Sequence, residues 1–68
     1  MLLDTSLSEH DIITLVDDLP EFYLYKGDRG VIVHIYSNFS DFEVEFSKDY
    51  FTTKVVTLKR FQFRIETK

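Results

Sequence analysis

The sequence predicts an all-β fold in which five short antiparallel strands close into a small barrel. Four segments show hydrophobic residues at every second position, the period of a strand with one buried face, and a fifth, residues 11–16, is apolar and rich in β-branched residues. A long loop follows the first segment, short turns join the next ones, and a single turn precedes the last. This order of strands and connections is typical of an SH3-like barrel, whose closure removes exposed sheet edges.

The five strands are predicted at residues 11–16, 30–36, 41–47, 53–58 and 62–66. The third has the clearest pattern, because Phe42, Val44 and Phe46 alternate strictly with Glu43 and Glu45. Such alternation indicates a strand with one face in the core and the other toward solvent. The fourth and fifth segments repeat this period in β-branched and aromatic residues, which favour strands.

The second strand follows directly from the long loop and is the most hydrophobic run of the chain. Its alternation predicts one face with Val31, Val33 and Ile35 and the other with Ile32, His34 and Tyr36. His34 is therefore expected to be a half-exposed strand residue.

The first strand has a helical alternative. Ser8-Glu9-His10-Asp11 has the spacing of a capping box, which would begin a helix running toward Val16. Residues 12–16 are rich in β-branched side chains, and Leu19-Pro20 interrupts any helix soon afterwards. A strand is the favoured interpretation.

The connections between the strands differ in character. Residues 37–40 and 47–52 are predicted as tight turns, residues 59–61 as a 3₁₀ turn, and residues 19–29 as the long first loop. Four phenylalanines are assigned to the core: Phe42, Phe46, Phe61 and Phe63.

Both glycines of the chain lie in Lys26-Gly27-Asp28-Arg29-Gly30, at the exit of the long loop. Gly27 is expected to adopt the positive φ of a turn, and Gly30 to let the next strand begin tightly against the barrel. Valine at either position is expected to loosen or unfold the domain.

A chain of this length has room for one small domain. This domain is predicted at residues 11–68, after a polar tail at residues 1–10. A 68-residue chain buries only about 60% of its unfolded surface, and this chain has no cysteine for disulfides. Seven Phe and four Tyr can compensate with large buried areas, although self-association would also cover them. The N-terminus has no signal-peptide pattern and no apolar run is long enough to span a bilayer, so a cytoplasmic location is expected.

Charge is distributed unevenly. Residues 1–25 carry six acidic and no basic side chains, whereas residues 48–68 have a net charge of +4. Pairing of the two ends within the fold would account for this distribution. The overall charge of −4 argues against nucleic acid as the primary partner.

No catalytic or cofactor-binding pattern occurs. The two histidines, His10 and His34, lack the spacing of a zinc site, and the serines lack a nucleophile elbow. The acidic group Asp17, Asp18 and Glu21 has no accompanying nucleophile or oxyanion hole. A protein without enzymatic activity, metal or cofactor is expected.

Several segments in order carry a resemblance to a known family. These are Asp17-Asp18-Leu19-Pro20-Glu21, then Lys26 to Tyr36 (KGDRGVIVHIY), then Phe42-Glu43-Val44-Glu45-Phe46, and finally Val56-Thr57-Leu58-Lys59. Over about residues 11–65 the chain resembles the bacterial family called domain of unknown function 4926. It departs from the family pattern in its polar N-terminus, residues 3–9, and in His34, where an acidic residue is more usual.

The resemblance implies a small SH3-like barrel without known activity, often encoded beside another small protein. Such pairing implies an antitoxin-like or regulatory role. A more distant similarity links residues 27–33 to the KOW motif of ribosomal proteins and transcription factors, whose modules bind RNA or protein.

Two surfaces are therefore expected to carry function. The first is a protein-binding surface of loop aromatics with an acidic rim: Phe22, Tyr23, Tyr25, Tyr36 and Phe39, with Asp17, Asp18 and Glu21. The alternative is a nucleic-acid surface of the KOW kind on the basic C-terminal strands: Lys54, Lys59, Arg60, Arg64 and Lys68.

Overall fold

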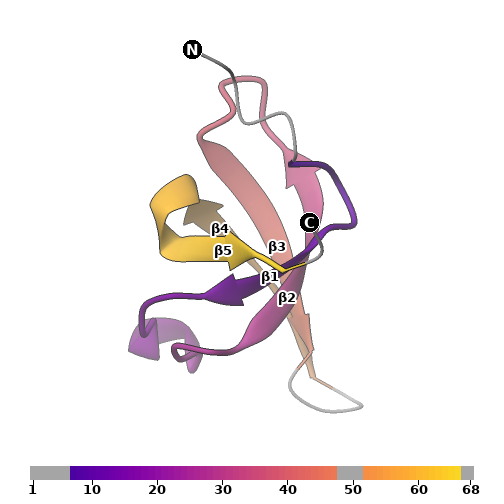
Figure 1. Cartoon of the computed structure of the whole chain (residues 1–68). Coiled ribbons are helices and arrows are strands. Elements are labelled where there is room, and N and C mark those ends of the chain that lie inside the picture. Colours follow the sequence, from indigo (N-terminus) through magenta and orange to yellow (C-terminus); the bar gives the residue numbers. More distant parts are fainter. Residues whose placement is uncertain (1–6, 48–51, 67–68) are drawn as a thin grey trace.

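A computed structural model describes residues 7–47 and 52–66 of the protein. The described residues form five strands and two short 3₁₀ helices (Figure 1). In chain order these are β1 (Ile12–Leu15), η1 (Pro20–Phe22), β2 (Arg29–Ile35), β3 (Asp41–Ser47), β4 (Thr53–Lys59), η2 (Arg60–Gln62) and β5 (Phe63–Ile65). All five predicted strands agree with the structure to within one residue at each end. None of the described residues forms a helix that is long and apolar enough to cross a membrane.

The strands form a single antiparallel sheet in the order β4-β3-β2-β1-β5. The prediction of an all-β, five-stranded fold is confirmed. β4 and β5 stand at the two ends of this order, and no pairing joins them among the described residues, so closure into a barrel is not confirmed. The sheet is strongly coiled, with β5 in front of β3 and β4 in Figure 1.

The N-terminal region is a strand preceded by a turn, as the favoured interpretation predicted. Ser8 and Asp11, the ends of the capping-box pattern, bond to each other across this turn. The Ser8 N–H donates to Asp11 Oδ2 at 2.8 Å, and the Asp11 N–H donates to the Ser8 carbonyl at 3.2 Å. β1 then pairs with β2 on one side and β5 on the other, because its β-branched residues suit the pleated sheet.

β2 does not keep one phase of alternation along its length. Its register with β3 shifts between Ile32 and His34, so that Val33 is an extra residue, a β-bulge. Ile32 is fully buried, whereas His34, two positions later, is exposed. The prediction that Ile32 and His34 share a face is therefore wrong, because the bulge reverses the phase of the strand between them. The exposed position of His34 itself is as expected.

The core lies inside the coiled sheet and includes side chains from every strand. Its buried hydrophobic residues are Ile13, Leu15, Leu19, Leu24, Ile32, Phe42, Val44, Phe46, Val56, Leu58 and Phe63. The Phe42 ring of β3 meets the Phe63 ring of β5 edge to face, with 5.3 Å between centroids. This contact holds the two distant strands of the sheet together.

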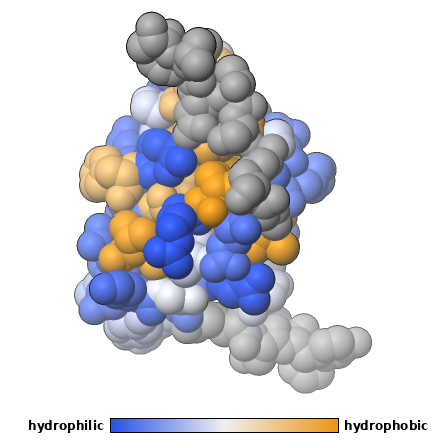
Figure 2. Space-filling model, viewed as in Figure 1, coloured by the Kyte–Doolittle hydropathy of each residue, from blue (hydrophilic) through white to orange (hydrophobic). Residues whose placement is uncertain are grey.

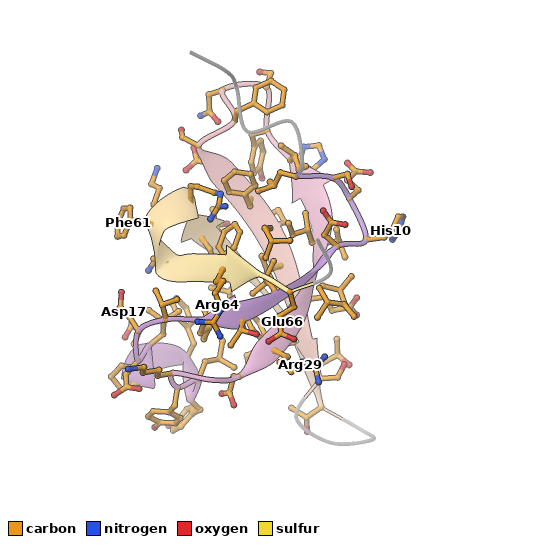
Figure 3. All side chains as sticks on the ribbon, in the orientation of Figure 1. His10, Asp17, Arg29, Phe61, Arg64 and Glu66 are labelled. Atoms are coloured by element: carbon orange, nitrogen blue, oxygen red, sulfur yellow. The ribbon has the colours of Figure 1, made fainter. Side chains whose placement is uncertain are left out.

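Phe61 was assigned to the core, and this assignment is wrong: its side chain is 75% exposed. Residues three apart in a 3₁₀ turn lie on the same side, so η2 brings Arg60 next to Phe63. Arg60 Nη1 donates to the Phe63 carbonyl at 3.0 Å, and its guanidinium lies over the Phe63 ring. Phe61 falls on the opposite side of the turn and points away from the sheet (Figure 3).

The glycines have the two different roles that were predicted. Gly27 adopts φ +95°, and its N–H donates to the Leu15 carbonyl at 2.9 Å, which closes the exit of the loop. Gly30 is buried in β2, and a Cβ there would lie 2.7 Å from Val44 Cγ1 and 2.8 Å from Phe46 Cε1. Gly30 therefore allows β2 to lie directly against side chains of β3.

Candidate functional site

The loop between β1 and β2 is held to the core by two leucines. Leu19 and Leu24 are buried and form an isolated bridge, in which each N–H donates to the carbonyl of the other at 2.8 and 3.2 Å. η1 lies between them and begins with Pro20, which suits the first position of a helical turn. The apolar anchors leave the residues between them on the outside of the molecule.

Three aromatic residues of this loop, Phe22, Tyr23 and Tyr25, are exposed, and we call them the η1 aromatic cluster. Tyr23 is the most prominent, with 73% of its surface exposed. It ends η1 in a left-handed conformation (φ 59°, ψ 35°), with its N–H donating to the Pro20 carbonyl at 3.0 Å. This conformation is unusual for a bulky side chain, and such backbone strain is concentrated at functional sites.

Lys54 of β4 supports the cluster from across the sheet. Its Nζ donates to the Phe22 carbonyl at 2.6 Å and lies 5.4 Å from the centre of the Tyr23 ring. The hydrogen bond and the cation–π contact fix the loop against the start of strand β4. The aromatic cluster is thereby displayed on an anchored loop.

Acidic residues surround the cluster as predicted, but their roles differ. The Asp18 carboxylate accepts the Lys26 N–H at 2.8 Å, and the Asp28 carboxylate accepts the Tyr25 N–H at 2.8 Å. These two bonds shape the loop, as aspartates commonly do in turns. Asp17 and Glu21 are exposed and make no hydrogen bond or ion pair with other described residues.

Tyr36 and Phe39, the other two predicted surface aromatics, lie in the β2–β3 turn. The η1 loop precedes β2 and this turn follows it, so the two sets are separated by a strand of about 20 Å (Figure 1). The structure therefore divides the predicted surface into two, with Asp17, Asp18 and Glu21 on the side of the η1 loop. Tyr50 and Phe51, at the predicted third turn, lie outside the described residues.

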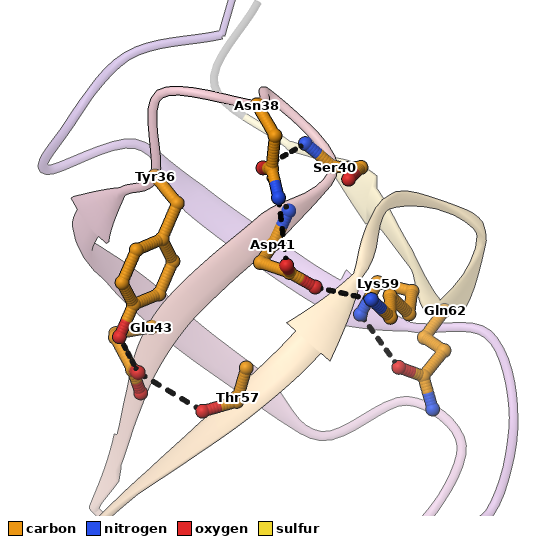
Figure 4. A network of polar contacts seen from close by, with 8 residues as sticks. All are labelled: Tyr36, Asn38, Ser40, Asp41, Glu43, Thr57, Lys59 and Gln62. Carbon is orange, nitrogen blue, oxygen red and sulfur yellow. Dashed lines mark hydrogen bonds and ion pairs between the residues drawn. The ribbon is translucent and has the colours of Figure 1, made fainter.

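A polar network covers the β2–β3 turn and the adjoining strands (Figure 4). Glu43 accepts hydrogen bonds from the Tyr36 hydroxyl and from the Thr57 hydroxyl, the latter at 2.9 Å. The bond to Glu43 raises the pKa of Tyr36 above its ordinary value, because losing the proton would remove the hydrogen bond. Tyr36 is thus part of the surface of the sheet, whereas Phe39 is 63% exposed at the tip of the turn.

The same network contains an ion pair between Asp41 and Lys59, and Asn38 also donates to Asp41 at 2.9 Å. The contact with Lys59 is the main reason that the pKa of Asp41 lies below its ordinary value, and the hydrogen bond from Asn38 is the next largest cause. We expect Lys59→Met to raise the pKa of Asp41, measured by NMR titration of its carboxyl group. Lys54→Met, which removes a lysine distant from Asp41, is the control and should leave that pKa unchanged.

The lowered pKa of Asp41 determines how its contribution to the stability of the fold changes with pH. A carboxyl group with a lower pKa in the folded chain stabilises the fold above its unfolded pKa, about 3.9. This stability is lost as the pH falls through the lower folded pKa. The difference in stability between the wild type and Lys59→Met should therefore narrow in acid, and a constant difference would contradict the pKa assignment.

The basic residues proposed for nucleic acid do not form one free surface. Lys54, Lys59 and Arg60 make the internal contacts described above, and Lys68 lies outside the described residues. Arg64 is exposed on β5 and has no ion-pair partner in the described part of the chain. Near it, Glu66 accepts a bond from Thr14 and pairs with Arg29 at 3.3 Å (Figure 3). The Arg29–Glu66 pair joins the middle of the chain to its C-terminal part, so the expected pairing of acidic residues 1–25 with basic residues 48–68 stays a prediction.

A shallow hollow of about 420 Å³ lies on the outer face of the sheet. It is open and lined by Ile12, Arg29, Gly30, Val31, Glu45 and Ser47. No group of three or more metal-ligating side chains occurs among residues 7–47 and 52–66. The exposed His34 has its Nδ1 3.8 Å from Glu9 Oε2 and packs its ring edge to face against the Tyr36 ring.

Comparison with protein families matches residues 9–65 to the family described as "Domain of unknown function (DUF4926)". The chain belongs to this family. The match includes all five strands, the η1 loop and the β2–β3 turn. Neither the search of curated proteins nor the search of solved structures gave a match.

For this member of DUF4926, the face seen in Figure 2 has small hydrophobic patches separated by hydrophilic residues. Phe61 in η2 is exposed, although the sequence pattern assigned it to the core. The polar neighbours of Phe61, Arg60 and Gln62, were the available signal that a one-turn link turns its central residue outward. Val55 is also exposed, and the alternation of β4 is consistent with this, because Val56 and Leu58 lie on one face of the strand and Val55, Thr57 and Lys59 on the other.

Proposed function

We propose that this DUF4926 protein is a non-enzymatic interaction module that binds a protein partner through the η1 aromatic cluster. The observation that carries this proposal is Tyr23, an exposed aromatic held in a left-handed conformation on an anchored loop. Tyrosine supplies a large apolar contact area and a hydroxyl group with few rotatable bonds, and it is enriched where protein interfaces are strongest. A loop that is already ordered also loses less entropy on binding.

Charge favours a partner with a basic contact surface. Asp17 and Glu21 flank the cluster without partners of their own among the described residues, so a basic side chain could pair with them on binding. Such rim charges increase the association rate and the selectivity more than the final affinity. We expect the affinity to reside mainly in the aromatic residues and the rate to depend on salt.

The proposed scaffold is an SH3-like barrel that is open between β4 and β5. Its support is the order of strands, the long loop after β1 and the 3₁₀ turn before β5. The Phe42–Phe63 ring contact also joins β3 to β5 through the core, close to the opening. Phe61 lies on the side of η2 that faces away from the core (Figure 3).

The proposed partner is a small protein encoded beside this one in a bacterial genome, for which the present chain is an antitoxin-like or regulatory companion in the cytoplasm. The family resemblance motivates this choice of partner. Co-expression of the two proteins followed by size-exclusion chromatography tests it, and co-elution is expected. Failure to co-elute would remove the pairing hypothesis.

The same experiment locates the contact surface. Tyr23→Ser should abolish co-elution, whereas Phe39→Ser, which removes an aromatic residue of similar exposure from the other end of β2, should not. Both variants should keep the far-UV circular dichroism and melting temperature of a folded domain. A loss caused by Phe39→Ser alone would place the interface at the β2–β3 turn instead.

The KOW-like alternative receives less support, because three of its five basic residues have internal partners. It predicts RNA or DNA binding that weakens steeply with salt. A mobility shift at about 50 mM salt that disappears in Arg64→Ala would favour it over the protein-binding proposal.

A further inference from the structure

β4 is an edge strand of the sheet. Within the part of the chain that the structure describes, its seven residues, Thr53–Lys59, pair with β3 and with no other strand. The other edge of the sheet is β5, which has three residues. An unpaired edge of seven residues can accept a further strand, and natural proteins usually cover or interrupt such edges.

The register identifies which backbone groups of β4 are free. The Lys59 N–H bonds to Gln62 Oε1 at 2.7 Å, which lies on the side away from β3. In a strand, alternate residues direct their backbone groups to the same side, so Val55 and Thr57 also point away from β3. No hydrogen bond joins the main chain of Val55 or Thr57 to another described residue on that side.

The side chains at this edge also leave it accessible at its centre. Val55 is 55% exposed and Thr57 is exposed, whereas Val56 between them is buried in the core. The ends of the strand are occupied, because Lys54 reaches to the Phe22 carbonyl and Gln62 binds the Lys59 N–H. The accessible stretch is therefore centred on Val56.

We infer that β4 pairs with β4 of a second copy of this chain, antiparallel, with the two-fold axis at Val56. This inference does not depend on the proposed function. Val55 of each copy then lies opposite Thr57 of the other, and these two pairs exchange four backbone hydrogen bonds. The ten strands of the two copies form one continuous sheet.

The side chains of β4 are compatible with antiparallel pairing between two copies of the strand. Each lysine faces a neutral residue, Lys54 opposite Leu58 and Lys59 opposite Thr53, so no like charges are opposed. The centre joins Val55 to Thr57 and Val56 to its own copy, and β-branched pairs are favourable between neighbouring strands. This self-complementarity is the reason to assign the edge to a second copy.

The proposed pairing is also complete with two copies of the chain. An interface between identical edges uses the same residues in both copies and leaves none for a third. The edges that remain exposed in the dimer are the three-residue β5 strands, which are too short to template extended growth. A dimer is therefore expected, not a filament.

Sedimentation velocity at protein concentrations from about 10 μM to about 1 mM tests the association, and a concentration-dependent dimer is expected. Val55→Pro removes an N–H that points away from β3, a position where edge strands tolerate proline, and should give a monomer. Phe39→Ser is the matched control, because it removes more exposed apolar surface and leaves the β4 edge intact. A monomeric wild type, or equal loss of dimer in both variants, would overturn the inference.

The register can be tested separately because the chain has no cysteine. In Val56→Cys the two sulfurs lie at the axis, where directly opposed Cβ atoms are about 5 Å apart, within reach of a disulfide. In Thr53→Cys the two copies of residue 53 lie about 20 Å apart. Mild oxidation should cross-link Val56→Cys and leave Thr53→Cys monomeric on a non-reducing gel, and the opposite preference would overturn the two-fold pairing.

Discussion

Replacing Gly30 with valine is expected to leave most of the chain unfolded at 25 °C. The first added carbon would lie 2.7 Å from Val44 Cγ1 and 2.8 Å from Phe46 Cε1, and both neighbours are buried side chains of the core. Overpacking of this kind costs about 1–3 kcal/mol for small insertions, and valine adds two further methyl groups. A single core in a domain this small supplies only about 3–5 kcal/mol of net stability.

Urea unfolding followed by circular dichroism measures this effect, with Gly30→Ala as the milder variant. Gly27→Ala is the matched control, because an added Cβ at Gly27 has no neighbour within 4 Å. Its cost comes only from the positive φ and should be about 1–2 kcal/mol. Equal destabilisation by alanine at both positions would show that the close approach at Gly30 is not the dominant effect.

The second large effect is expected for Phe63→Ala. The Phe63 ring is buried beneath Arg60, and its contact with the Phe42 ring joins β5 to β3 within the core. Loss of a buried phenylalanine costs about 3–5 kcal/mol, comparable to the whole stability of the domain. The variant should lose its cooperative thermal transition.

Phe61→Ala is the control for this prediction, since it removes the same side chain two positions earlier. Phe61 is exposed on the far side of η2, and surface substitutions of this kind change stability by about 0.5 kcal/mol or less. Calorimetry of the two variants compares them directly. A large loss of stability in Phe61→Ala would contradict the orientation of η2.

The sequence predicted the strands well because alternation is a property of each strand by itself. Phe42, Val44 and Phe46 are all buried, as their pattern indicates. The orientation of Phe61 was not predictable in this way, since a three-residue link is too short to show a period. The bulge at Val33 could not be predicted either, because it is defined by the register with β3, and β2 taken alone alternates without interruption.

The candidate site was predicted in composition but not in arrangement. The loop positions of Tyr23 and Phe39 follow from turn residues around them, and both side chains are exposed. Whether two loops meet depends on the length and direction of the strand between them, which placed these residues at opposite ends of β2. The left-handed conformation of Tyr23 had no sequence signal, because glycine or asparagine is usual there.

The extra residue at Val33 has a consequence for comparing members of the family. Before it, even-numbered residues of β2 such as Ile32 face the core, and after it odd-numbered residues such as Ile35 do so. In a homologue with one residue fewer in β2, the side chains of one half of the strand would exchange their inward and outward positions. Alignments should therefore place insertions and deletions in the turns on either side of β2, and a length change within the strand itself would signal a different set of side chains on the outer face.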